Sequence, residues 1–298
     1  MFKFRMTHAL SATLFCVMAG VSPAAHAEGD GLAEAGVLKV GIIPAEESTH
    51  VIRQSQGLMD QVSKKLGIKA ELYVGSDYNA TIEALRAGKI DVALMGAFGY
   101  VLATTQAPVE AFAVTVTAKN QSPNYHSIII TRANADDLTS LKSLGGRTFA
   151  FVDPSSTSGS LMPKSAMVGA GMDPEKDLKK VIYSGGHDAS IIAVAEGKVD
   201  AAAVADRIYA NACDKKAVDC SKIKVIWTSP EIPNDPLFYR KALSADMKKK
   251  IADAFYSIKK TTFGEMGVVE RFDPATDKTY DIVREIAKSL HLDLTKMK

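Results

Sequence analysis

The chain of 298 residues is 47% hydrophobic and 23% charged, a composition typical of folded globular proteins. This composition excludes disordered, collagen-like and polytopic membrane classes. The length favours two lobes of roughly 100–150 residues each over a single domain, and two lobes leave a cleft between them.

The first 27 residues have the pattern of a secretory signal peptide. Lys3 and Arg5 precede an apolar run over 9–21, and small residues at 25–27 provide a cleavage site. The apolar run is shorter than the ~18 residues that a membrane span needs. We therefore predict that residues 1–27 are removed and that the mature chain works in the periplasm.

The predicted mature chain carries balanced charge. It has 34 basic and 34 acidic side chains, because the first 27 residues contain two basic residues and no acidic one. A net charge of zero argues against a nucleic-acid partner, which would require a basic surface. The histidines show no paired spacing of the kind that binds a metal, so we predict no metal and no other cofactor. We expect the protein to be a monomer.

In chain order, short apolar runs typical of strands alternate with stretches of helical period. The first expected strand, 39–43, is followed by a helix over 51–66 that ends at Gly67. An amphipathic stretch near the end of the chain runs over 246–260. Further strands are expected at 70–74, 112–116, 127–131, 148–152, 180–183 and 224–228.

The chain contains an internal repeat. Residues 79–95, the first copy, align without a gap with residues 188–204, the second copy, and seven of the seventeen positions are identical. Each copy predicts a small-residue helix, then a glycine in the left-handed conformation, Gly88 or Gly197, and then a short strand. Because a strand is also expected before each copy, each lobe should contain a strand–helix–strand unit of a parallel sheet.

The residues that precede the two copies are candidates for a ligand site. Ligands of open parallel sheets bind where a strand ends and the next helix begins. Tyr78 precedes the first copy, and His187 occupies the corresponding position before the second. We expect the hydroxyl and the imidazole to face one another from the two lobes.

The expected strand 148–152 leads into a segment rich in hydroxyl side chains. The start of a helix near 156–158 would offer free backbone N–H groups and the positive end of the helix dipole to an anion. A plain helix cap needs only one hydroxyl. The segment contains many more, which favours an anion-binding site: Ser155, Ser156, Thr157, Ser158 and Ser160.

Two stretches are predicted to carry the chain between the lobes, near 118–127 and near 228–236. Turn residues dominate the first and prolines the second. Lobe one is then built from residues 28–126 and 236–298, and lobe two from 127–235.

Five segments together resemble the phosphonate-, phosphite- and phosphate-binding periplasmic proteins of ABC importers. The segments are GIIPAE at 41–46, DYNATIEALRAGKIDVAL at 77–94, DPSSTSGSLMP at 153–163, SGGHDASIIAVAEGKVDAAA at 184–203 and IPNDP at 232–236. The resemblance implies an α/β fold of the two-lobed, type II periplasmic binding protein class. Each lobe would be a mixed, mainly parallel sheet flanked by helices, with the ligand in the cleft and a membrane permease as partner.

The resemblance also implies a ligand site of seven residues: Tyr78, Tyr125, Ser156, Thr157, Ser158, His187 and Asp235. The hydroxyl cluster and the histidine would hold the PO3 head of a small phosphorus oxyanion, and the two tyrosines would bound it. Asp235 would accept a hydrogen bond from a ligand oxygen that keeps its proton. A carboxylate in this place favours such ligands over sulfate-like ions.

Arg207 departs from the family pattern. Family members that prefer aminoalkylphosphonates carry a carboxylate near this position to hold the amine. An arginine facing the cleft would suit phosphite, methylphosphonate or a ligand with a second anionic group. The alternative is an arginine on a solvated helix face.

Three further predictions concern chemistry. Cys213 and Cys220 form an even pair in an oxidising compartment and predict a local disulfide. A serine hydrolase is a remote alternative, because the chain has no G-x-S-x-G elbow and no evident acid to orient His187, so we predict no catalytic residue and no enzyme. A binding protein for another small solute, such as an organosulfonate or a thiamine precursor, is the stronger alternative.

Overall fold

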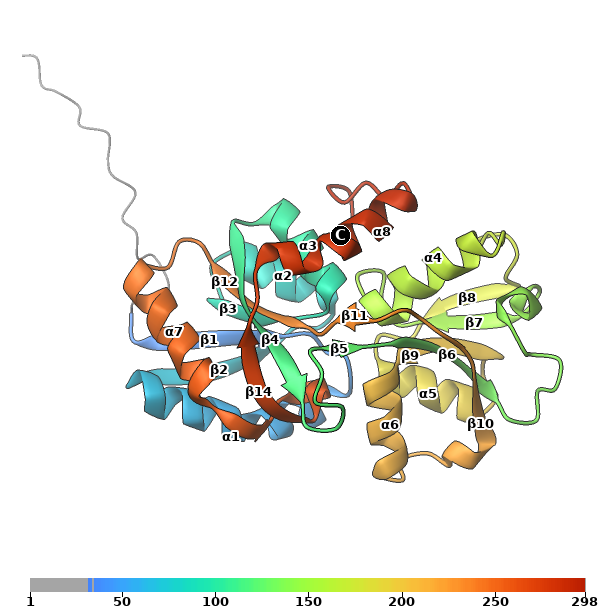
Figure 1. The fold of residues 1–298 in the computed structure, drawn as a ribbon, viewed down its shortest axis with the longest axis horizontal. Coiled ribbons are helices and arrows are strands. Elements are labelled where there is room, and N and C mark those ends of the chain that lie inside the picture. The colour runs from blue at the N-terminus through green and yellow to red at the C-terminus, as the bar shows by residue number, and fades with distance from the viewer. Residues whose placement is uncertain (1–31, 34, 298) are drawn as a thin grey trace, which may run out of the picture.

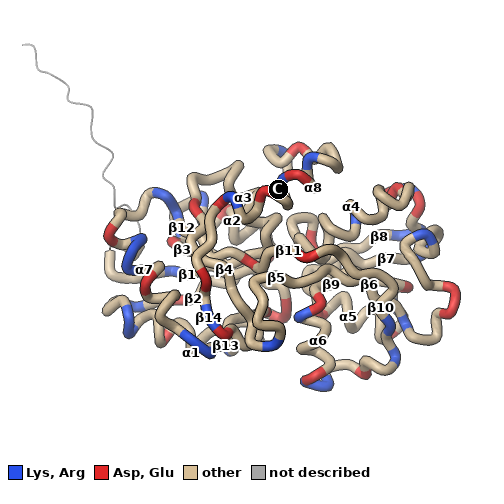
Figure 2. The backbone as a smooth tube through the Cα atoms, viewed as in Figure 1, with Lys and Arg blue, Asp and Glu red and all other residues tan. Residues whose placement is uncertain are grey.

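The computed structural model describes residues 32–33 and 35–297, and the predicted signal peptide at 1–27 lies outside the described residues. The strands form two large sheets, each covered by helices, and a two-stranded ribbon lies between them (Figure 1). We call the seven-stranded sheet with its helices lobe one and the five-stranded sheet with its helices lobe two. Acidic and basic residues are interspersed along both lobes (Figure 2).

The sheet of lobe one has the strand order β13-β14-β4-β12-β3-β1-β2. Its strands are β1 (Val37–Ile42), β2 (Lys69–Val74), β3 (Val92–Leu94), β4 (Val109–Thr117), β12 (Pro236–Arg240), β13 (Lys259–Thr262) and β14 (Val268–Pro274). The sheet of lobe two has the order β10-β6-β9-β7-β8. Its strands are β6 (Ser127–Arg132), β7 (Thr148–Phe151), β8 (Lys180–Tyr183), β9 (Ala201–Ala205) and β10 (Ile223–Thr228).

The pairing within the sheets differs in part from the prediction. In both lobes the strands around the repeat are parallel, with β1 between β2 and β3 and β7 between β8 and β9. The remaining pairs are antiparallel, so the sheets are mixed rather than mainly parallel. The reason is that the chain enters or returns to a lobe through β6 and β12, which run against their neighbours in the parallel unit.

Eight α-helices cover the sheets of the described chain. They are α1 (Ser48–Leu66), α2 (Tyr78–Arg86), α3 (Ala97–Gln106), α4 (Met162–Gly169), α5 (His187–Ala195), α6 (Asp206–Asp214), α7 (Ala245–Ser257) and α8 (Asp281–Ser289). Shorter turns are the π-helical η2 (Thr157–Leu161) and the 3-10 segments η1 (Leu141–Leu144), η3 (Cys220–Lys222), η4 (Gly264–Met266) and η5 (Asp277–Tyr280).

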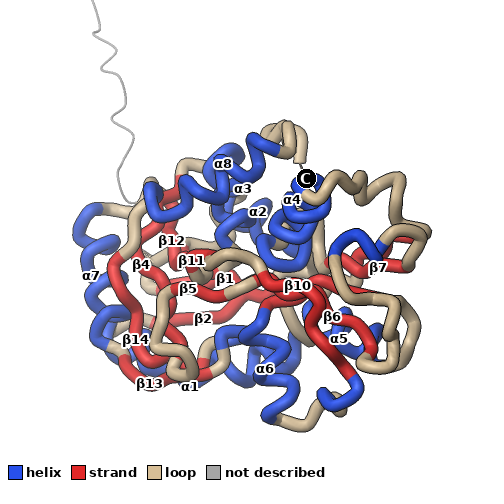
Figure 3. Tube along the Cα trace, turned by 45° about the vertical axis from the view of Figure 1, so that its right-hand side comes forward, coloured by secondary structure: helices blue, strands red, loops and turns tan. Residues whose placement is uncertain are grey.

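The helices of lobe one lie on both faces of its sheet (Figure 3). On one face, α1 and α7 bury Leu58 and Phe255 in a common core. On the other face, α2 and α3 bury Ile82 and Phe98. Because apolar contacts hold the sheet on both sides, the ends of its strands are fixed platforms for the residues that follow them.

The internal repeat folds into the predicted units. Gly88 and Gly197 both have positive φ, 68° and 71°, which glycine adopts without strain. Each copy also has its own ion pair between an aspartate just before its strand and an arginine of another strand. Asp91 lies 3.0 Å from Arg240, and Asp200 lies 3.9 Å from Arg132.

Two strands cross between the lobes. The antiparallel ribbon of β5 (Asn124–Tyr125) and β11 (Ile232–Pro233) pairs the outgoing chain with the returning one. Both lie in the stretches where crossings were predicted. Helix α8 adds a further link, because it packs against α3 of lobe one and α4 of lobe two.

The two lobes also contact each other across the cleft. The N–H of His187 donates to the carbonyl of Ala45 at 2.8 Å, and the N–H of Glu47 donates to the Asp188 carboxylate at 2.9 Å. These bonds join the start of α5 in lobe two to the loop after β1 in lobe one. The structure is therefore a closed arrangement of the lobes.

The predicted disulfide is confirmed: Cys213 at the end of α6 is bonded to Cys220 at the start of η3. Across the described part of the chain, none of the helices combines the length and the apolar character needed to cross a bilayer.

Candidate functional site

A small, narrow cavity lies where the lobes and the ribbon meet. All seven residues of the predicted ligand site line it, and each is between 1% and 4% exposed. The complete lining is Ile43, Ala45, Tyr78, Gly96, Tyr125, Ser156, Thr157, Ser158, His187, Arg207 and Asp235. Residues that are up to 192 positions apart in the chain are thus gathered around one space.

The cavity is surrounded by the starts of helices. Tyr78 is the first residue of α2, and His187 is the first residue of α5, as the repeat predicted. Gly96 is the N-cap of α3, and Ser156 is the N-cap of η2. Each of these helices follows a strand of its sheet, which is where open sheets present ligands with free backbone N–H groups.

The hydroxyl cluster has divided roles. Ser156 performs the plain capping function, because its Oγ accepts a hydrogen bond from the Gly159 N–H at 3.0 Å. Thr157 reaches across the cleft, where its Oγ1 accepts from the Phe98 N–H at 2.9 Å. A side chain at Gly96 would place its Cβ 3.0 Å from this Oγ1, so glycine permits the close approach. The Thr157 proton remains available for an acceptor in the cavity.

His187 is held as a neutral donor. Its Nδ1 accepts a hydrogen bond from the Ala205 N–H at 3.1 Å, which assigns the remaining ring proton to Nε2. Burial, helped by the charge of Arg207, lowers the pKa of His187 to about 3. The imidazole therefore offers an N–H group without a positive charge at neutral pH.

The two tyrosines also remain protonated. Burial, together with nearby carboxylates, raises the pKa of Tyr78 well above its usual value. Burial and the charge of Asp235 raise the pKa of Tyr125 to about 12. Both phenols keep their O–H donors at any pH at which the protein works.

Arg207 is buried in the cavity wall, and the alternative of a solvated helix-face arginine is wrong. Its side chain is 9% exposed, and its Nη2 lies 3.0 Å from Oδ2 of Asp235. The guanidinium also lies over the ring of Tyr125, 4.2 Å from the ring centre, in a cation–π arrangement. Arg207 thus compensates the charge of Asp235, which sequence reasoning had treated as a lone carboxylate.

Glu265 is the residue that the sequence analysis missed. It is fully buried in η4, and burial together with the charge of Asp235 raises its pKa well above the usual range. The raised pKa favours the protonated form of Glu265 near the ion pair of Arg207 and Asp235. No motif or spacing in the sequence marks this glutamate, because a 3-10 turn distant from the other site residues brings it there.

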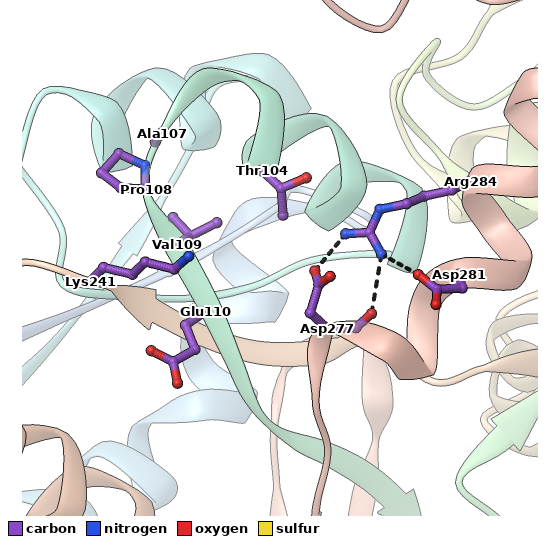
Figure 4. Close-up of a pocket in the computed structure, with 9 residues that line it drawn as sticks. All are labelled: Thr104, Ala107, Pro108, Val109, Glu110, Lys241, Asp277, Asp281 and Arg284. Atoms are coloured by element: carbon purple, nitrogen blue, oxygen red, sulfur yellow. Dashed lines mark hydrogen bonds and ion pairs between the residues drawn. The ribbon is translucent and has the colours of Figure 1, made fainter.

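A second pocket, on lobe one, contains none of the predicted site residues (Figure 4). Three of its charged groups, Arg284, Asp277 and Asp281, satisfy one another. Arg284 donates to the carboxylates of Asp277 and Asp281, and Tyr100 also donates to Asp277. These contacts link η5 to α8 and α3, so we assign this network to stability rather than to ligand binding.

Two lobes joined by a two-stranded crossing, with a cavity at the helix starts between them, define the type II periplasmic solute-binding proteins. A family model described as "ABC transporter, phosphonate, periplasmic substrate-binding protein" matches residues 40–280. The chain belongs to this family of periplasmic substrate-binding proteins.

Two relatives and one solved structure are similar to this chain over most of their length. The chain is 33% identical to the phosphonates-binding periplasmic protein of Escherichia coli, over 92% of this chain and 81% of that protein. It is 28% identical to the phosphate-import protein PhnD of Mycolicibacterium smegmatis, over 95% of this chain and 96% of that protein. A binding protein component of an ABC phosphonate transporter from Pseudomonas aeruginosa has the same fold, with a TM-score of 0.77, 28% identity and coverage of 84% and 85% of the two chains.

Proposed function

We propose that this protein captures a small phosphorus oxyanion of the phosphonate, phosphite or phosphate type and delivers it to the permease of an ABC importer. The observation that carries the proposal is the convergence of four helix starts and their neutral donors on one enclosed cavity. Relatives named for phosphonate binding and for phosphate import support the choice of ligand class.

The donor set suits a buried anion. The hydroxyls of Tyr78, Thr157 and Ser158 and the Nε2–H of His187 are all neutral, and each lies on a rigid element. Neutral donors avoid the desolvation penalty that an added buried cation would bring. They are also fixed before the ligand arrives, so little conformational entropy is lost on binding.

Closure of the lobes follows from the same contacts. Thr157 of lobe two bonds to Phe98 of lobe one, and His187 bonds to Ala45, so both contacts require the lobes to be together. A ligand held by Tyr78 from one lobe and Ser158 from the other adds to these contacts. It therefore shifts the population from an open form to the closed form.

The family supports a periplasmic setting for this protein. We propose that residues 1–27 act as a signal peptide, that the mature monomer moves freely in the periplasm, and that the permease recognises the closed form. The protein itself has a carrier role and performs no chemical reaction on the ligand.

Thermal unfolding with a ligand panel tests the proposal. The panel contains phosphate, phosphite, methylphosphonate, 2-aminoethylphosphonate, sulfate and taurine. A ligand present at 100 times its Kd should stabilise the protein by about 2.7 kcal/mol. We expect a phosphorus compound to give the largest shift. Stabilisation by taurine alone would instead support the organosulfonate alternative.

A further inference from the structure

One wall of the cavity contains the ion pair of Arg207 and Asp235, which differs in chemistry from the neutral donors of the other walls. One guanidinium contact of Arg207 is satisfied, from Nη2 to Asp235. Within the described residues, Nε and Nη1 of the same side chain are buried and have no hydrogen-bond partner. A buried donor left without an acceptor destabilises the folded protein, and a charged donor does so more strongly. Such donors therefore favour a ligand that brings acceptor atoms.

The guanidinium cannot easily turn away from the cavity. The ion pair with Asp235 and the ring of Tyr125 hold it on two sides. Asp235 follows the crossing strand β11, and Tyr125 lies on the crossing strand β5, so both partners belong to the crossing itself. The position of Arg207 is therefore tied to the part of the molecule that both lobes share.

Arg207 also limits the length of a ligand. Besides the cavity of the proposed ligand site, it lines another pocket, distinct from the one in Figure 4, formed with Lys119, Asn211 and Met266 among others. Arg207 therefore lies between the two spaces. A substituent longer than one or two atoms would have to displace the guanidinium from its ion pair, and we expect such ligands to bind weakly.

Resting on the function proposed above, we propose that the Arg207–Asp235 pair selects a ligand whose fourth substituent on phosphorus is an oxygen, which makes inorganic phosphate the preferred ligand. The fourth oxygen of phosphate accepts hydrogen bonds from the guanidinium. The hydrogen of phosphite and the methyl group of methylphosphonate accept none, so these ligands leave the donors of Arg207 unsatisfied. This replaces the expectation from the sequence that an arginine facing the cleft would suit these two ligands. Phosphate also keeps a proton at neutral pH, which sulfate lacks, and that proton can be donated to Asp235.

Titration calorimetry on protein freed of bound ligand by unfolding and refolding tests this selection. The probes are inorganic phosphate, phosphite and methylphosphonate, and the quantity compared is the ratio of their Kd values. For the unaltered protein we expect phosphate to bind at least about tenfold more tightly than methylphosphonate or phosphite. In Arg207→Lys, which keeps the charge but loses the planar fork of donors, we expect that preference to fall by about tenfold.

The control is Arg240→Lys. Arg240 forms a buried ion pair of the same 3.0 Å length, with Asp91, away from the cavity. We expect this variant to change stability while leaving the preference for phosphate within about twofold of the unaltered protein.

The outcomes separate the two proposals. Equal or tighter binding of phosphite or methylphosphonate, or an unchanged ratio in Arg207→Lys, overturns the selection by Arg207 while leaving the capture of phosphorus oxyanions intact. Binding of none of the three probes overturns the proposed function itself. If Arg207→Lys does not fold, the ratio measured on the unaltered protein still decides the case.

Discussion

The two copies of the repeat begin in the same way but cap their helices differently. In lobe one, Asp77 precedes Tyr78, and its carboxylate accepts from the Ala80 N–H at 2.7 Å. In lobe two, Gly186 precedes His187 and provides no side-chain cap. The second helix start is satisfied in another way: the Ala189 N–H donates to the Asp188 carboxylate of the same turn, and the His187 N–H donates to the Ala45 carbonyl of lobe one. One fold unit, used twice, gives a helix start that is capped within its own lobe and one that is completed by a contact across the cleft.

The donors of the cavity follow the same division. Lobe two contributes Ser156, Thr157, Ser158, His187 and Arg207, whereas lobe one contributes Tyr78 and mostly apolar or backbone surface. We infer that lobe two sets the affinity for the anion and that lobe one mainly closes over it.

The largest expected effect comes from Thr157→Val, which keeps the shape of the side chain and removes its hydroxyl. The ligand loses a donor, and the Phe98 N–H loses its acceptor across the cleft. We expect the Kd for the best ligand to rise by about 100-fold, measured by calorimetry. Thr131→Val is the matched control, because its buried hydroxyl bonds only within lobe two, to the Asp200 carbonyl. Equal losses in both variants would contradict a site role for Thr157.

The next effect tests whether the helix start of lobe two faces the ligand. Gly186→Asp copies the cap of lobe one into lobe two and places a carboxylate beside the anion. A side chain is allowed there by the backbone, since φ of Gly186 is −149°, although its Cβ would lie 2.6 Å from the Asp188 carboxylate, which would have to move. Gly186→Asn makes the same steric demand without the charge. We expect the Asp variant to bind about tenfold more weakly than the Asn variant. Similar affinities would mean that the helix start does not face the ligand.

The reverse change should affect stability and not binding. Asp77→Ala removes the cap of α2, and the loss of a helix cap typically costs about 1 kcal/mol. For a chain of this size we expect Tm to fall by about 2–4 °C. Calorimetry should give an unchanged Kd for the ligand. A strongly altered affinity would mean that the cap by Asp77 also positions Tyr78 for the ligand.

The smallest effect concerns pH. Burial raises the pKa of Glu46, next to the interlobe contacts, to about 7. Because the unfolded chain releases this proton at lower pH, the folded protein loses stability as the pH rises from the ordinary carboxyl range through 7. Glu46→Gln should therefore raise Tm by about 2 °C at pH 8.5 and leave it unchanged at pH 4.

The neighbouring residue gives a control of opposite sign. Glu47 is exposed, and its pKa is lowered by hydrogen bonds from the N–H of Thr49 and of His50. Glu47→Gln should lower Tm at pH 8.5, because the ionised carboxylate caps α1. If Tm changed in the same direction in both variants, this would contradict a raised pKa for Glu46 and a lowered pKa for Glu47.

Much of the fold could be read from the sequence because its signals are local. The glycines at 88 and 197 end helices whatever surrounds them, and apolar runs of strand length lie within a few residues of the observed strands. The antiparallel pairs could not be read in this way. They depend on which lobe a returning strand joins, and that is decided by packing between segments far apart in the chain.

The site shows the same limit. Positions at the end of a strand and the start of a helix are recognisable, so Tyr78, Ser156 and His187 could be predicted. The position of the Arg207 guanidinium depends on an ion pair with a residue 28 positions away. The raised pKa of Glu265 depends on its burial and on the charge of Asp235. Which buried charges compensate one another depends on the three-dimensional structure, and no pattern in the sequence predicts it.

The β5–β11 ribbon has a consequence for how a ligand enters. Tyr125 lies on this ribbon and Asp235 follows it, so neither residue is carried away by whichever lobe moves. When the lobes part, we expect these two side chains to stay behind as a floor near the pivot. An arriving anion would then contact the residues near the hinge first, and the serines and the histidine would contact it when the lobes close.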